Sequence, residues 1–201
     1  MRKAVLNRET KETAILLSLN LDMSGENDIR TGIGFFDHML NLFAFRAGIS
    51  LTVSCRGDLN VDGHHTVEDV GLCLGQAMRE ALGDKSGIRR YGAATVPMDE
   101  SLASCALDIS GRPFLVFNAT FPLGRVGVAE ENPNMPAFET ELVEEFFRAV
   151  SSAAGLTLHI NLAYGGNTHH RIEAIFKAFG CAFGQAVCVT GGGVSSTKGV
   201  L

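Results

Sequence analysis

The pattern His-His-x-x-Glu occurs twice in this chain, in residues 64–68 and in residues 169–173. The chain has six histidines, and four of them lie in these two copies, so chance does not readily explain the repeat. On a helix, residues four positions apart lie on one face, so the first histidine and the glutamate of each copy can bind the same ion. The second histidine points about 100° away and would reach a different ion. We therefore interpret the repeat as a duplicated metal site.

The candidate metal ligands are the histidines and glutamates of both copies together with the two remaining histidines: His64, His65, Glu68, His169, His170, Glu173, His38 and His159. This set provides three histidines and one glutamate for each of two ions, which leaves octahedral positions open for substrate or water. Nitrogen and carboxylate ligands without thiolate suit Mn, Fe, Co, Ni or Zn. A lone histidine is more often a packed core residue, but the doubled motif favours ligands. Asp69 has no counterpart in the second copy, where Ala174 stands, so we expect it to orient an imidazole.

Composition argues against several classes of function. The formal net charge is −5 and no basic run is present, so nucleic-acid binding is not expected. No apolar stretch is long enough to span a membrane, and no signal-peptide pattern follows the first residues. The five cysteines show no CxxC spacing, and an odd number of them indicates a reducing, cytoplasmic setting.

The elements that must position the first copy can be read from the apolar pattern. Apolar alternation between turn residues predicts strands at 3–8, 12–21, 49–55 and about 58–62. A helix develops from about residue 33 and ends at Gly48. The first His-His copy opens a second helix, which ends near Leu82 before Gly83.

The second half repeats this order. Strands are predicted near 93–97, 101–109, 113–121 and 156–160, with a loop rich in Gly, Pro, Asn and Glu at 124–138. A helix near 139–153 ends at Gly155, as the earlier one ends at Gly48. Thr168 is the candidate N-cap of the helix that carries the second copy to about Val189. The glycine-rich tail that begins at Gly191 has a flexible composition.

These elements predict an α+β fold of two related halves, residues 1–91 and 92–201, each a sheet with two helices. Helices must bury their apolar stripes, so we expect them to pack together between the sheets. Strand-helix alternation and a GxGxxG sequence are both missing, which argues against a nucleotide-binding doubly wound fold.

The sequence closely resembles the imidazoleglycerol-phosphate dehydratase family. The matching motifs cover nearly the whole chain in order: Gly32-Ile33-Gly34-Phe35-Phe36-Asp37-His38, Asp62-Gly63-His64-His65, Asp108-Ile109-Ser110-Gly111-Arg112-Pro113, His169-His170-Arg171-Ile172-Glu173 and Ser196-Thr197-Lys198-Gly199. The resemblance implies dehydration of imidazole glycerol phosphate to imidazole acetol phosphate in histidine biosynthesis. It also implies a fold like domain 2 of ribosomal protein S5, and a homo-oligomer of twenty-four subunits with sites between neighbouring chains.

The resemblance further implies two manganese ions per active site. It assigns His38, His64, Glu68 and His170 to one ion, and His65, His159, His169 and Glu173 to the other. Metal on both imidazole nitrogens of the substrate would stabilise an imidazolate, which can expel the neighbouring hydroxyl to give a diazafulvene. Proton transfer requires a carboxylate, for which Glu12 matches the family's substrate-contacting glutamate and Glu173 is the alternative. The residues at the family's phosphate-binding positions are Arg90, Arg112, Lys177, Ser196 and Lys198.

The chain departs from the family pattern at a few positions. Leu42 replaces a Gln found in several members, Gly34 replaces a common Pro, and the loop at 127–138 is longer than in many relatives.

Two other classes of function stay open. A two-metal hydrolase typically has bridging, Asp-rich carboxylates, which this ligand set lacks. A metal-stabilised assembly protein would leave the arginines and lysines of the phosphate set without a purpose.

Overall fold

The computed structural model describes residues 1–25, 27–127 and 136–199. The first half contains three strands, a helix, a strand and a second helix: β1 (Lys3–Glu9), β2 (Thr13–Asn20), β3 (Asp28–Arg30), α1 (Gly34–Ala47), β4 (Ser50–Gly57) and α2 (His64–Leu82). The strand order in the sheet is β1-β2-β4-β3. Strands β1 and β4 each run antiparallel to β2, whereas β3 runs parallel to β4.

The second half has the same succession of elements: β5 (Tyr91–Met98), β6 (Ser101–Asp108), β7 (Phe114–Asn118), α3 (Leu142–Ala154), β10 (Thr157–Tyr164) and α4 (Thr168–Val187). Its strand order, β5-β6-β10-β7, again ends in a parallel pair, β7 with β10. A small ribbon of β8 (Arg125–Val126) and β9 (Phe138–Glu139) is inserted before α3. The α+β fold of two related halves is confirmed, and β5 begins at Tyr91, the last residue of the predicted first half.

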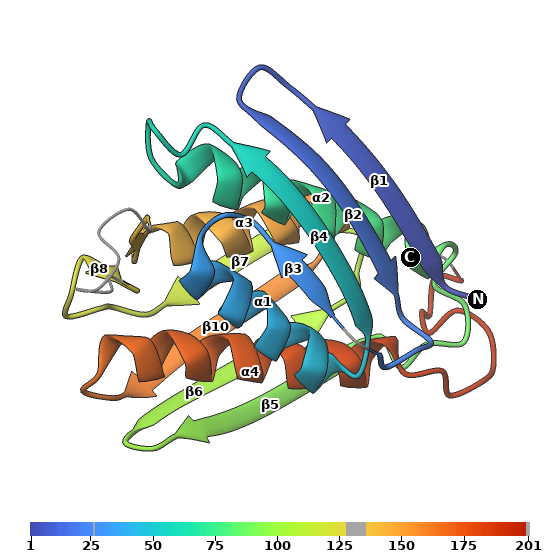
Figure 1. Ribbon diagram of the computed structural model, residues 1–201. Coiled ribbons are helices and arrows are strands. Elements are labelled where there is room, and N and C mark those ends of the chain that lie inside the picture. The colour runs from blue at the N-terminus through green and yellow to red at the C-terminus, as the bar shows by residue number, and fades with distance from the viewer. Residues whose placement is uncertain (26, 128–135, 200–201) are drawn as a thin grey trace.

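The helices lie between the two sheets (Figure 1). Helix α2 packs against β1, β2 and α3, and helix α4 packs against β5, β6 and α1. Aromatic rings join the helices to one another: Phe43 of α1 stacks on Phe179 of α4 at 4.9 Å, and Phe147 of α3 meets Phe176 of α4 at 5.0 Å. All four phenylalanines are fully buried, so one core holds both halves together.

Glycines permit a close helix contact between α2 and α3. A Cβ atom at Gly75 would lie 2.7 Å from the carbonyl oxygen of Val150, and one at Gly71 would lie 2.9 Å from the Cβ of Ala149. A side chain at either position would push the helices apart. Among the helices in the described ranges, none combines the length and the apolar character that a membrane span requires.

The helix ends agree largely with the sequence. Helices α1 and α3 stop at Gly48 and Gly155, which adopt φ angles of 68° and 70° in the left-handed region where glycine carries no steric penalty. The predicted N-cap of α4 was wrong. Asn167, not Thr168, caps the helix, because its side chain accepts hydrogen bonds from the backbone N–H groups of His169 and His170.

Other differences concern short segments. The strand predicted at 58–62 is wrong, because that segment turns back with a hydrogen bond from the Val61 N–H to the Asp58 carbonyl (2.8 Å). Strand β3 was missed because three residues are too few to show alternation. The long predicted loop at 124–138 contains β8 and reaches β9, and residues 128–135 lie outside the described part of the chain.

Candidate metal centre and active site

One cluster of potential metal ligands joins the two halves. His38 comes from α1, and His169 and Glu173 come from the first turns of α4. One ligand atom from each of the three side chains lies within 4.8 Å of the others. The Nε2 atoms of His169 and His38 lie 3.1 Å and 3.5 Å from Glu173 Oε2. Both imidazoles are about half exposed while the carboxylate is buried, so a cation held here would keep an open side.

The Glu173 carboxylate is set up to stay ionised. Burial raises its pKa, but Lys177 Nζ lies 2.5 Å from Oε1 and, together with His169 and His38, lowers the pKa below its usual value overall. An ionised oxygen beside two imidazole nitrogens is a donor set that divalent transition metals accept readily. The residues present therefore fit the metal that the sequence motif predicts.

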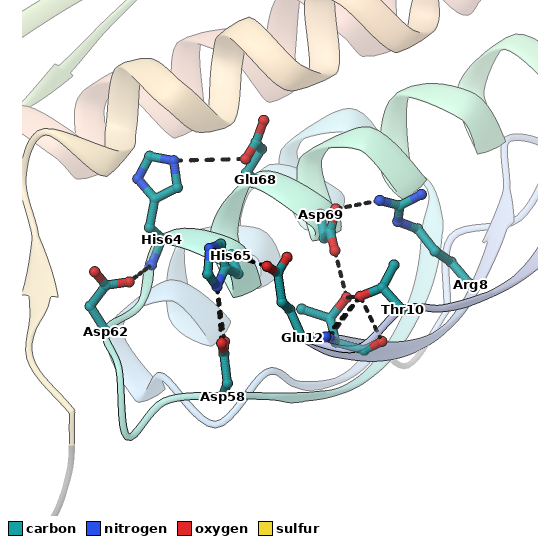
Figure 2. Close-up of polar contacts among 10 residues, drawn as sticks. Arg8, Thr10, Glu12, Asp58, Asp62, His64, His65, Glu68 and Asp69 are labelled. Atoms are coloured by element: carbon teal, nitrogen blue, oxygen red, sulfur yellow. Dashed lines mark hydrogen bonds and ion pairs between the residues drawn. The ribbon is translucent and has the colours of Figure 1, made fainter.

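The first His-His-x-x-Glu copy has the expected helical geometry. His64 Nε2 lies 3.7 Å from Glu68 Oε2, one turn along α2. The rings of His64 and His65 are 6.2 Å apart and nearly perpendicular, at 86°. In Figure 2, His64 faces Glu68, whereas His65 turns toward Glu12 and Asp58. The two histidines of the pair thus face different carboxylates, as their spacing on the helix predicted.

A carboxylate lies against the Nδ1 atom of the second histidine in each copy. Asp58 Oδ2 is 3.0 Å from His65 Nδ1, and Glu100 Oε2 is 2.7 Å from His170 Nδ1. These hydrogen bonds are the main cause of the raised pKa of each imidazole. Sequence reasoning missed both carboxylates. Glu100 is 70 residues from its partner, and Asp58 lies in the segment misread as strand, so no spacing rule reveals them.

The expectation that Asp69 orients an imidazole was wrong. Its carboxylate accepts hydrogen bonds from Arg8 at 2.8 Å and from the Thr13 hydroxyl at 2.5 Å. Asp69 therefore ties α2 to strands β1 and β2. Figure 2 shows its contact with Arg8 of β1. In the described structure the carboxylate that lies within hydrogen-bond distance of an imidazole in this region is that of Asp58.

Four of the five residues in the predicted phosphate set line one open pocket of about 650 Å³: Arg90, Arg112, Ser196 and Lys198. Arg90 is held by two hydrogen bonds to Asp108, at 2.7 Å and 3.0 Å, and donates a third to the Ser195 carbonyl at 2.7 Å. Guanidinium, ammonium and hydroxyl groups together suit a phosphate. Lys177 is not in this lining, because it contacts Glu173 instead.

The remaining predicted site residues are not gathered into the same cluster. His159 lies on the outer face of β10, exposed between Leu158 and Ile160, which are fully buried. Within the described ranges, the only group of three potential ligands is that of His38, His169 and Glu173. This grouping differs from the partition that the family resemblance implies, in which His38 shares an ion with the first copy.

Comparison with known proteins gives concordant matches. The family model for imidazoleglycerol-phosphate dehydratase matches residues 31–183. The chain is 56% identical over 202 residues to the imidazoleglycerol-phosphate dehydratase of Acetivibrio thermocellus, covering all of this chain and 99% of the relative. It is 55% identical over 203 residues to that of Listeria welshimeri, with both chains fully covered.

Solved structures agree with this result. The Staphylococcus aureus imidazoleglycerol-phosphate dehydratase superposes with a TM-score of 0.81 at 46% identity, covering 94% of this chain and 99% of that one. The Pyrococcus furiosus enzyme, in complex with (S)-C348, gives 0.79 at 36% identity, covering 98% and 100%. The duplicated fold and these matches place the protein among the hydro-lyases. The chain belongs to the imidazoleglycerol-phosphate dehydratase family.

Proposed function

We propose that this protein dehydrates imidazole glycerol phosphate to imidazole acetol phosphate in histidine biosynthesis, with two manganese ions in each active site. The observation that carries the proposal is the doubled His-His-x-x-Glu motif, whose second copy meets His38 in a three-ligand cluster. Similarity over the full chain to named dehydratases supports the same substrate.

The proposed metal ligands are the six histidines with Glu68 and Glu173. When bound, manganese would supply Lewis-acid stabilisation of negative charge on the imidazole ring of the substrate. Two observations support metal binding by this set: the imidazole and carboxylate donors suit a divalent transition metal, and the contacts with Lys177 and His169 lower the pKa of Glu173. His38 and His64 are about half exposed, so substrate can reach the proposed ligands from solvent.

Glu12 is the proposed acid and base. It lies in the turn between β1 and β2, with its side chain 54% exposed and Oε1 3.8 Å from His65 Nε2. Among the described residues its carboxylate makes no hydrogen bond, so it is free to exchange protons with a bound substrate. Glu173, the alternative, is buried and engaged by Lys177 and His169. This engagement favours Glu12.

The substrate phosphate would occupy the pocket of Arg90 and Arg112, with Ser196 and Lys198 closing it. Asp108 pre-orients the Arg90 guanidinium, so little side-chain freedom is lost when the dianion arrives. Lys177 would have to reach the phosphate from its place beside Glu173, and its predicted role stays a prediction.

We further propose the twenty-four-subunit assembly that the family resemblance implies, with active sites between neighbouring chains. The outward position of His159 supports this. The second sheet lies between His159 and the helices that carry the other ligands, so His159 can share an ion only with ligands of a neighbouring chain. A cytoplasmic location is part of the same proposal, and all five cysteines are free thiols.

A turnover assay tests the proposal against its rivals. The protein is stripped of metal with a chelator, then incubated with imidazole glycerol phosphate, with and without Mn²⁺, and the keto product is measured alongside free phosphate. We expect the keto product only when Mn²⁺ is present. Release of phosphate without the keto product would favour the hydrolase, and no turnover with an intact metal-dependent oligomer would favour the assembly protein.

A further inference from the structure

Glu12 and Glu100 occupy equivalent positions in the two halves. Each immediately precedes the second strand of a hairpin, β2 at Thr13 and β6 at Ser101. Those strands pair in the same way with the strand that leads to a His-His copy, β2 with β4 and β6 with β10. The two glutamates nevertheless have different contacts.

Glu100 holds the loop before α4 and the second histidine at once. Its Oε1 accepts hydrogen bonds from the N–H groups of Gly166 at 3.0 Å and Asn167 at 2.7 Å. Its Oε2 lies 2.7 Å from His170 Nδ1. One carboxylate oxygen therefore binds the loop and the other binds the histidine, so both oxygens are engaged.

In the first half, the loop between β4 and α2 contains a carboxylate, that of Asp58, which contacts the histidine. Asp58 follows the last residue of β4, and its two oxygens lie 3.2 Å and 3.0 Å from His65 Nδ1. After β10 the chain continues with Gly165 and Gly166, which have no side chain to play this part. Asp58 thus leaves the carboxylate of the hairpin glutamate, Glu12, without a hydrogen bond among the described residues, with its Oε1 3.8 Å from His65 Nε2. In the second half Glu100 makes the histidine contact that Asp58 makes in the first.

We propose that Asp58 and Glu100 are positioning residues that hold the proton of His65 and His170 on Nδ1 and so present the Nε2 lone pair to a metal ion. A neutral imidazole has one donor and one acceptor nitrogen, and a carboxylate can only accept. The proton must therefore lie on the nitrogen that faces the carboxylate. The proposal rests on the proposed function in so far as manganese is the ion bound.

The two carboxylates respond differently to conversion into an amide. In Glu100→Gln the oxygen stays on the two loop N–H groups, which only an acceptor can satisfy, so the NH₂ group faces His170 Nδ1. That arrangement moves the imidazole proton to Nε2 and blocks the metal-binding nitrogen. In Asp58→Asn the amide oxygen can still face His65 Nδ1, because Asp58 has no second side-chain partner among the described residues.

The test compares Glu100→Gln, Asp58→Asn and Asp58→Ala, with Glu80→Gln as the control. Glu80 is an exposed glutamate on α2, and among the described residues its carboxylate accepts a hydrogen bond from Gln76 alone. In the metal-free protein, imidazole ¹⁵N chemical shifts report the tautomers, and thermal melting reports folding. Mn²⁺ affinity is then measured by competition with a chelating indicator.

We expect Glu100→Gln and Asp58→Ala to lower Mn²⁺ affinity about 10- to 100-fold, the usual effect of removing a partner of a ligating histidine. Asp58→Asn should have a smaller effect, and Glu80→Gln none. Glu100→Gln should also shift His170 to the Nε2–H tautomer while its melting temperature stays at the wild-type value. Unchanged tautomers in both Glu100→Gln and Asp58→Ala would overturn the inference.

The outcomes separate this inference from the proposed function. Wild-type protein that binds no Mn²⁺ but shows Nδ1–H tautomers, lost in Glu100→Gln, would contradict the proposed function and leave the positioning role standing. Normal Mn²⁺ binding by both Glu100→Gln and Asp58→Ala would contradict the positioning role alone. If Glu100→Gln does not fold, Asp58→Ala decides the question in the other half.

Discussion

Lys177 Nζ lies 2.5 Å from Glu173 Oε1, one turn further along α4, and the two side chains are only 13% and 9% exposed. We predict that Lys177→Met lowers the free energy of unfolding of the metal-free protein by about 3 kcal/mol, because it leaves a buried carboxylate without its cation. Urea denaturation with and without Mn²⁺ measures this. Added Mn²⁺ should stabilise the variant more than the wild type.

The matched control is Arg148→Met on α3. Arg148 forms an exposed pair with Glu144, with side chains 56% and 44% exposed, and such pairs contribute at most about 1 kcal/mol. Equal decreases in the free energy of unfolding in the two variants would show that the Lys177–Glu173 contact stabilises the protein no more than an exposed ion pair does.

The duplicated motif predicts that His64→Ala and His169→Ala each remove bound metal and nearly all activity. Each variant deletes the histidine that shares a helix face with a glutamate, Glu68 or Glu173. Metal content by elemental analysis, with particle size by light scattering, checks the result. Full metal occupancy in both variants would end the two-site interpretation, and a change in particle size is expected where a site bridges subunits.

For the proton-transfer step, we predict that Glu12→Gln retains metal and assembly but loses turnover by about 10²- to 10⁴-fold. The amide keeps the size of the side chain and removes its ability to exchange a proton. Metal content and kcat of the same preparation measure both parts. Glu9→Gln, an exposed change on β1, serves as the control. Turnover near the wild-type value would transfer the role to Glu173.

Phosphate binding predicts a role for Lys198. In Lys198→Met, KM should rise by an amount equivalent to about 1.5–3 kcal/mol, the cost of losing a charge-assisted contact. Added salt should weaken substrate binding to the wild type more than to the variant, because screening acts on the charge that the variant lacks. Lys3→Met, an exposed change on β1, is the control. An unchanged KM would place Lys198 outside the phosphate site.

The described tail is tied back to the body of the protein. The Gly87 N–H donates to the Gly193 carbonyl, and Arg90 donates to the Ser195 carbonyl. The glycine-rich composition alone indicated only flexibility. The contacts show how Ser196 and Lys198 are brought beside Arg90, a placement that requires two segments about 100 residues apart to meet.

The sequence by itself determined the helices, most strands and the pairing of ligands within each helix. These features depend on local periodicity and on glycine stops, so residues a few positions apart carry all the information. His64 with Glu68 and His169 with Glu173 were therefore predictable, because one helical turn separates each pair.

Only the tertiary structure decided which of these groups meet. Packing of α1 on α4 brings His38 to Glu173, and the β5–β6 turn carries Glu100 to His170. The outward direction of His159 follows from which face of β10 the helices cover. Such contacts join residues far apart in the chain, and their geometry depends on how the two halves pack, which no local spacing encodes.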